Sequence, residues 1–185
     1  MENHQEFRIP EMFVAPVHEE EFKRYMLDVP GREHYPLLYQ ISQVIQEDKG
    51  AVVMDIGTYK GCSALALSAN PIVNVISVDL QNTRILYPEP ENVSFAIGDI
   101  FTPTFKPFFE MCSFILLDTD HEGSFEQKFV EYLDEIKYNG IVMFDDIHLN
   151  DEMKQFWSKQ QATRTTMDIT KIGHWSGTGI IIYGK

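Results

Sequence analysis

The chain has 185 residues, of which 28 are acidic and 15 are basic, so its formal net charge is −13. With 44% hydrophobic residues it can bury a core, and its length suits a single domain over residues 1–185. The acidity argues against nucleic acid or an anionic membrane as a partner, because both attract clustered Lys and Arg. A small-molecule substrate, a cationic ligand or a metal ion is the expected partner.

Cysteine usage and the lack of long apolar runs indicate where the protein acts. Cys62 and Cys112 make no disulfide framework, and Cys62 is expected to be a small packed residue. The first residues lack the basic-then-apolar layout of a secretory signal, and no apolar run approaches the roughly 18 residues of a membrane span. The expectation is a soluble, cytoplasmic protein.

The first fifty residues are expected to form a helical cap over the remainder. Residues 18–27 are predicted to form a charged helical segment that a Pro-Gly pair breaks. A second helix is predicted to begin at Tyr35-Pro36, because Pro favours the first helical position. Its apolar residues fall on one helical face, at Leu38, Ile41 and Ile45.

From residue 51 onward, short apolar runs alternate with helical stretches. The runs are AVVM, VNVISV, VSFAI, SFILL, GIVMF and GIIIY, apolar throughout, as in strands that are covered on both faces. Helices are predicted over 61–70, 123–138 and 151–161. The last two strands, about 166–172 and 179–183, are predicted to form an antiparallel hairpin. The fold class is therefore α/β, with a doubly wound, mostly parallel, seven-stranded Rossmann-like sheet.

The predicted parallel strands end in acidic residues, at Asp55, Asp79, Asp99, Asp118 and the pair Asp145-Asp146. Each Asp alone has a structural explanation, since Asp is common in turns and helix caps. Acidic residues at the ends of all five strands favour a ligand-binding site, because the carboxyl ends of parallel strands form the ligand-binding edge of such sheets. These carboxylates are expected to lie on one rim.

The loop after the first predicted strand lacks the G-x-G-x-x-G spacing of a dinucleotide site. Asp55 instead precedes a G-x-x-x-G loop, which would repel a pyrophosphate and attract an ammonium group. Asp79 is placed to accept hydrogen bonds from a ribose diol, and Gly98-Asp99 is placed to contact an adenine edge. Together these features predict binding of a nucleoside that carries an amino acid.

The segment DIGTYKGCSA resembles the first motif of class I S-adenosylmethionine (SAM)-dependent methyltransferases, and is especially similar to that of the catechol-type O-methyltransferases. The resemblance covers residues 51–185. It implies that Asp55 meets the methionine ammonium, Ser63 its carboxylate, Asp79 the ribose and Leu80 the adenine. The alternative is structural: Tyr59 would be an aromatic residue of a loop, and Ser63 would begin a helix. The other implied cofactor-binding residues are Gly57, Thr58, Tyr59, Gly61, Gly98, Asp99 and Asp118.

Two acidic stretches, LDTDHE at 117–122 and FDDIH at 144–148, bring carboxylates to adjacent strand ends without a Lys or Arg to offset them. A divalent cation bound between the carboxylates would offset this repulsion. Oxygen ligands favour a hard ion, so Mg²⁺ is expected, with Mn²⁺ or Ca²⁺ as alternatives. Zinc is less expected because the nearby histidines lack a multi-His spacing. In metal-dependent O-methyltransferases and the cephalosporin hydroxylase-like branch, similar acids hold an ion. Carried over, the metal ligands are Asp118, Asp145 and Asp146.

His121 lies three residues after Asp118, where catechol-type enzymes place a lysine base. The resemblance therefore implies that His121 and Asp118 are catalytic, with the imidazole removing the proton of a metal-bound hydroxyl before methyl transfer. The D-x-D-H string is also similar to the D-x-x-H pattern of other small-molecule methyltransferases. The alternative for His121 is that it caps the next helix or hydrogen-bonds a carboxylate.

Three other segments each have two interpretations. His148 and Asn150 either support the site or form a turn, and the turn is favoured. Residues 173–177 either close over the substrate or make a plain hairpin turn. Glu33-His34-Tyr35 either faces the cofactor or begins a helix, and the helix start is favoured.

The predicted function is that of an O-methyltransferase that acts on a small hydroxylated molecule with a divalent metal. Catechol itself is not implied, because His121 replaces lysine and the terminal hairpin offers no obvious acid. The short segments between the second and fourth strands leave the first fifty residues or a second subunit to cover the site, so a homodimer is a further expectation. The alternatives are a regulatory or hydroxylase-like protein that binds SAM without methyl transfer and a nicotinamide oxidoreductase.

Overall fold

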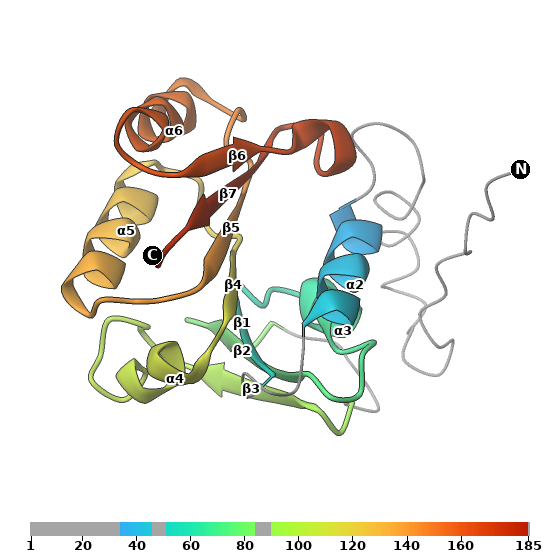
Figure 1. The fold of residues 1–185 in the computed structure, drawn as a ribbon. Coiled ribbons are helices and arrows are strands. Elements are labelled where there is room, and N and C mark those ends of the chain that lie inside the picture. Colours follow the sequence, from blue (N-terminus) through green and yellow to red (C-terminus); the bar gives the residue numbers. More distant parts are fainter. Residues whose placement is uncertain (1–33, 46–50, 84–89, 185) are drawn as a thin grey trace, which may run out of the picture.

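The computed structural model describes residues 34–45, 51–83 and 90–184. Its centre is a seven-stranded sheet in the order β3-β2-β1-β4-β5-β7-β6 (Figure 1). The five parallel strands are β1 (Val52–Ile56), β2 (Asn74–Asp79), β3 (Val93–Ile97), β4 (Phe114–Leu117) and β5 (Ile141–Asp145). The last two strands, β6 (Thr166–Asp168) and β7 (Thr178–Ile182), run antiparallel to their neighbours. The predicted fold class is confirmed.

Helices cover both faces of this sheet, as Figure 1 shows. On one face α2 (His34–Val44) packs against α3 (Cys62–Leu67); on the other lie α4 (Lys106–Met111), α5 (Ser124–Glu135) and α6 (Asp151–Thr163). Each layer of helices packs on the sheet around its own buried hydrophobic cluster. One cluster contains Leu38 and Leu65, and the other contains Phe129 and Trp157. Because both faces are covered, the parallel strands are mostly apolar, as the sequence pattern indicated.

The elements differ from the predicted ones in three places. The strand predicted over 166–172 stops at Asp168, and a 3₁₀ turn, η3 (Thr170–Ile172), follows it. The Asp168 carboxylate accepts hydrogen bonds from Thr170 N and Oγ1, which bends the chain out of the sheet. The helix predicted over 61–70 is shorter, and α4 was not predicted because it is only six residues long. The helix predicted over residues 18–27 lies outside the described residues.

The order of the strands reverses between β1 and β4, where ligands bind in open α/β sheets. There β1 pairs with both β2 and β4 through Ile56. The next residue, Gly57, has a φ of +101°, and a Cβ added to it would overlap the carbonyl oxygen of Asp118. Only glycine allows the two chain segments to approach this closely.

Neither cysteine forms a disulfide and both are buried, as expected of Cys62 as a packed residue. Within the part of the chain that the structure describes, no helix has the length and apolarity that crossing a bilayer requires.

Candidate functional site

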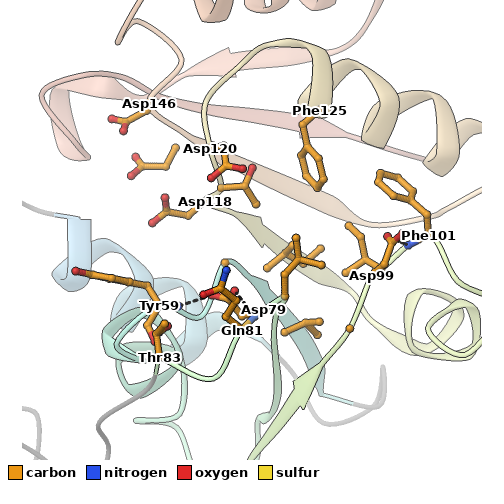
Figure 2. Close-up of a pocket in the computed structure, with 18 of the residues that line it drawn as sticks. Tyr59, Asp79, Gln81, Thr83, Asp99, Phe101, Asp118, Asp120, Phe125 and Asp146 are labelled. Carbon is orange, nitrogen blue, oxygen red and sulfur yellow. Dashed lines mark hydrogen bonds between the residues drawn. The ribbon is translucent and has the colours of Figure 1, made fainter.

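A cavity of about 630 Å³ opens at the carboxyl ends of the parallel strands. In Figure 2, Asp118 and Asp146 lie at one end of it and Asp99 and Phe101 at the other, with Tyr59 and Asp79 on the side between them. Most of the predicted site residues therefore come together around one cavity. Those that line it are Gly57, Tyr59, Asp79, Leu80, Gly98, Asp99, Asp118, Asp145 and Asp146.

The loop after β1 is held to the end of β2 by Asp79. Its Oδ2 accepts a hydrogen bond from Tyr59 N at 2.9 Å (dashed in Figure 2), and its Oδ1 accepts one from Gln81 N at 3.1 Å. Thr83 Oγ1 donates to the Tyr59 carbonyl at 3.0 Å. Tyr59 and Leu80 are 56% and 67% exposed, so two apolar side chains stand open at this wall of the cavity. Such exposed apolar groups beside oriented acceptors are typical of a ligand site.

Asp55 does not lie on the rim, in contrast to the prediction. The strand continues through Ile56, and the Asp55 carboxylate is fully buried, where its Oδ2 accepts a hydrogen bond from Ser77 Oγ at 2.7 Å. Burial raises the pKa of Asp55 to about 7, and hydrogen bonds from Ser77 and Ser63 offset this only in part.

Three further predicted cofactor-binding residues, Thr58, Gly61 and Ser63, are also buried and do not line the cavity. Thr58 Oγ1 lies 2.7 Å from Ser77 Oγ, so the predicted loop and Asp55 share one hydrogen-bonded group. These residues therefore form the layer directly behind the cavity wall.

The far end of the cavity is aromatic. Phe101 and Phe125 line it with their ring centroids 5.6 Å apart, and Lys128 Nζ lies 3.8 Å from the Phe101 centroid. The pair Gly98-Asp99 was predicted at this end, whereas these three residues were not. The two aromatic residues belong to different elements, and neither has a local pattern that distinguishes it from a core residue.

At the other end of the cavity lie three aspartates and three histidines, here called the aspartate–histidine cluster: Asp118, Asp145, Asp146, His34, His121 and His174. All of them line the cavity except the predicted base His121, which contacts two of the lining aspartates. His121 Nε2 lies 3.4 Å from Asp118 Oδ1 and 3.2 Å from Asp146 Oδ2. His174 Nδ1 lies 2.9 Å from Asp146 Oδ1 and 3.3 Å from Asp145 Oδ2. His34 Nδ1 lies 3.7 Å from Asp145 Oδ1. The carboxylates therefore have imidazole neighbours, contributed mostly by segments outside the two acidic stretches.

The cluster shifts the proton affinity of its members. Burial lowers the pKa of His121, but the hydrogen bond and charge of Asp118 and the charges of Asp146 and Asp145 raise it to about 9. Burial also lowers the pKa of His174, which Asp145 and Asp146 raise to about 11. Burial would raise the pKa of Asp145, yet it is lowered because His34 and His174 favour the charged carboxylate. At neutral pH, protonated imidazoles thus balance part of the negative charge.

Of the two interpretations of His121, the hydrogen-bonded one describes its contacts with Asp118 and Asp146. Both interpretations hold for His34, which starts α2 and also lines the cavity; Glu33 lies outside the described residues. His174, in the segment 173–177, lines the cavity as well. His148 instead pairs with Asp168 at 2.7 Å, away from the lining residues.

Three residues bordering the site have backbone conformations that side chains disfavour. The φ angles are +42° at Tyr59, +55° at His121 and +59° at Asp146. Each such conformation costs on the order of 1–3 kcal/mol, and surrounding bonds must hold it. At Asp146 these bonds come from Ser176 Oγ and from the imidazoles of His121 and His174. Strain concentrated in this way is a feature of functional sites.

Asn150 connects the His121 loop to α6. Its Oδ1 accepts a hydrogen bond from Met153 N at 2.8 Å, capping the helix, and its Nδ2 donates to the His121 carbonyl at 2.9 Å. The predicted turn role of Asn150 therefore takes the form of a helix cap that also fixes a cavity loop.

Asn150→Ala is expected to lower the free energy of unfolding by about 1–2 kcal/mol, measured by denaturant unfolding, because both hydrogen bonds are lost. Asn150→Asp is the matched control, since a carboxylate still caps the helix but cannot donate to His121. It should lose less than half as much. Equal losses in the two variants would show that the contact with His121, rather than the cap, carries the stability.

No family model and no curated protein matches the chain. Comparison with solved structures finds methyltransferases. The S-adenosylhomocysteine (SAH)-bound methyltransferase PaMTH1 of Podospora anserina aligns with a TM-score of 0.63 at 14% identity, covering 94% of this chain and 90% of that one. The O-methyltransferase TomG of Streptomyces achromogenes, in complex with SAM, gives 0.57 at 14% identity, covering 95% and 89%.

A third structure, the O-methyltransferase of Bacillus cereus in complex with SAH, gives a TM-score of 0.54 at 13% identity and covers 95% of this chain and 84% of that one. At these identities the likeness is one of fold. The chain shares the fold of these methyltransferases.

Proposed function

We propose that this protein is a SAM-dependent O-methyltransferase that acts on a small hydroxylated molecule with the help of a divalent cation. The observation that carries the proposal is the cavity at the switch point between β1 and β4, with Asp79 at the end of β2 on one side and the aspartate–histidine cluster at one end. The motif that resembles class I methyltransferases forms the loop beside this cavity. The fold shared with SAM- and SAH-bound methyltransferases supports the same function.

In this proposal Asp79 accepts hydrogen bonds from the ribose hydroxyls, and Leu80 and Phe101 contact the adenine. Asp79 is half-buried and Leu80 exposed, so both are accessible from the cavity. The buried charge of Asp55, behind Gly57, favours the methionine ammonium over any anionic group. In this proposal the methionine part of the cofactor points toward the aspartate–histidine cluster.

The reaction joins a hydroxyl oxygen of the acceptor to the methyl carbon as the bond from that carbon to the sulfonium sulfur breaks. The hydroxyl proton must leave, and we assign it to His121 in its neutral form. A cation bound among the carboxylates would favour this form, because it would offset the charges that raise the pKa of His121. His121 Nε2 lies 3.4 Å from Asp118 Oδ1. A divalent cation at Asp118, Asp145 and Asp146 would, when bound, lower the pKa of the acceptor hydroxyl and fix its orientation. Asp145 Oδ1 is a fitting donor, being buried and without a hydrogen-bond partner among the described residues.

The lining also bears on the acceptor. Six aspartates line the cavity against a single lysine among the described residues: Asp79, Asp99, Asp118, Asp120, Asp145 and Asp146 against Lys128. Carboxylates so arranged repel anions, so a neutral or cationic acceptor is proposed. In the same proposal, residues outside the described part or a second copy of the chain cover the open side.

The function is tested by calorimetry with SAH, followed by methyl transfer from labelled SAM to a panel of phenols and alcohols. Asp79→Asn is expected to weaken SAH binding by about 10–100-fold, because hydrogen bonds to a charged acceptor are lost. Asp151→Asn, at an exposed position at the start of α6, should bind as the native protein does.

Absence of SAH binding by the native chain would refute the methyltransferase function. Binding without transfer to any acceptor of the panel would favour a protein that binds SAM without catalysis. NADH binding in place of SAH would favour an oxidoreductase.

A further inference from the structure

The aspartate–histidine cluster does not have the donor set that the sequence suggests. The expected ligands were three carboxylates, Asp118, Asp145 and Asp146, which together suit a hard ion such as Mg²⁺. In the structure both oxygens of Asp146 already have partners. Oδ1 accepts from Ser176 Oγ and faces His174 Nδ1 at 2.9 Å, and Oδ2 lies 3.2 Å from His121 Nε2. The contacts of Asp146 therefore orient Ser176, His174 and His121.

Among the buried atoms of the cluster, His34 Nδ1 and Asp145 Oδ1 lack a hydrogen-bond partner among the described residues. Their side chains are only 5% and 6% exposed, so bulk solvent does not reach these atoms. Buried polar atoms without partners are costly and need an explanation. The two atoms face each other at 3.7 Å, which is too long for a hydrogen bond.

This separation suits two ligands of one metal ion. Bonds of about 2.1 Å at angles between 90° and the tetrahedral value put donor atoms about 3.0–3.4 Å apart, so a shift of a few tenths of an ångström would close the site. The carboxylate of Asp118 offers a third ligand, and the donor atoms of His34, Asp118 and Asp145 lie within 4.8 Å of one another. Asp118 is also one-third exposed on the cavity side, where a bound hydroxyl could reach the ion.

We propose that this protein binds a first-row transition ion, of the Zn²⁺ and Co²⁺ type, through His34 Nδ1, Asp145 Oδ1 and the Asp118 carboxylate. Asp146, His121 and His174 form the hydrogen-bonded layer that orients these ligands. An imidazole ligand favours such ions over Mg²⁺, which prefers oxygen donors and an octahedral shell of waters. The proposal rests on the proposed function and refines it, by replacing Asp146 with His34 as a ligand and Mg²⁺ with a nitrogen-binding ion.

The test uses the full chain, stripped of metal with a chelator. Co²⁺ is titrated in and followed by its visible d–d absorption, and Mg²⁺ is titrated in parallel by calorimetry. We expect one Co²⁺ per chain, displaced by Zn²⁺ and bound at least about 100-fold more tightly than Mg²⁺. An affinity for Mg²⁺ equal to that for Co²⁺, or no bound ion at all, would overturn the proposal.

Variants identify the ligands. His34→Gln should weaken Co²⁺ binding by at least about 10–100-fold, because losing even a residue that only supports a metal ligand has an effect of this size. The weak Mg²⁺ binding should stay unchanged. Asp145→Asn should weaken both, and His148→Gln, at a histidine paired with Asp168 outside the cluster, should weaken neither. Unchanged Co²⁺ binding by His34→Gln, with the native spectrum, would exclude His34 as a ligand.

SAH binding to the metal-free chain, by calorimetry, separates the two proposals. Where SAH binds and Co²⁺ does not, the metal site is refuted and the proposed function stands. Where Co²⁺ binds and SAH does not, the metal site stands without the methyltransferase function. Thermal unfolding, with a native-like cooperative transition, serves as the measure that His34→Gln and Asp145→Asn are folded.

Discussion

Replacing Asp55 by asparagine is expected to stabilise the protein without its ligand by about 2–4 kcal/mol at pH 8, while weakening its binding of SAM by about 10–100-fold. The carboxyl of Asp55 is fully buried, and burial raises its pKa to about 7. Asparagine has nearly the same shape and can keep a hydrogen bond with Ser77, so the main change is the loss of a charge that the interior disfavours.

The stabilisation should depend on pH in a defined direction. The unfolded chain releases this proton near pH 3.8, whereas the folded protein keeps it up to about pH 7. Between these values the folded state binds more protons than the unfolded state, so the free energy of unfolding falls as the pH rises. The asparagine of the variant does not titrate, and the difference between native and variant should therefore grow from about pH 4 to pH 7 and then level off.

Thermal unfolding across this pH range measures the effect, and calorimetry with SAM measures the affinity. Asp120→Asn is the matched control, because Asp120 lines the same cavity but is exposed. It should change neither stability nor its pH dependence. A stability difference for Asp55→Asn that is constant between pH 4.5 and pH 8 would contradict the proposed cost of the buried charge.

Gly57→Ala is expected to destabilise the protein strongly, because it adds a methyl group where the chain segments after β1 and β4 approach each other closely. Its φ of +101° disfavours alanine, and the added Cβ would overlap the carbonyl oxygen of Asp118. Both atoms belong to backbone that is held by sheet hydrogen bonds, Gly57 N to the Val78 carbonyl and Asp118 N to the Ile56 carbonyl, so neither yields easily. We expect a loss of about 3–5 kcal/mol in the free energy of unfolding.

Thermal unfolding would show this loss as a fall in Tm of about 10 °C or more, together with the loss of SAH binding. Gly98→Ala is the comparison, because Gly98 also lines the cavity but its added Cβ meets only the Phe105 ring, at 3.0 Å. Its effect should be smaller in both measurements. Similar losses for the two variants would mean that crowding by any methyl group, and not the close approach of β1 and β4, is responsible.

The sequence predicted the sheet well because each parallel strand is recognisable from its own residues. Continuous apolar runs mark strands covered on both faces, and the acid at the end of a run marks its carboxyl end, as for Asp79 and Asp118. The short helix α4 escaped prediction because six residues are too few to show helical periodicity.

The site was predictable where its residues end parallel strands, because these ends meet at one edge of the sheet. Asp145 and Asp146 are adjacent, and their proximity to Asp118 follows from strand order. The participation of His34 and His174 depends on how α2 and the segment before β7 fold over the sheet, which no local pattern encodes. The burial of Asp55 likewise depends on Ser77 in the neighbouring strand. Tertiary packing therefore decided which polar residues share a site.

The position of β7 has a consequence for the order of folding. This strand lies between β5 and β6, so the sheet can only be completed after the last strand in sequence has been inserted between two earlier ones. His174 lies just before β7, and His34 belongs to the first described helix, so the contacts of the cluster span most of the chain. Contacts between residues this distant in sequence form slowly. The site is therefore expected to be among the last parts of the protein to become ordered during folding, after β1, β2 and β4 have paired.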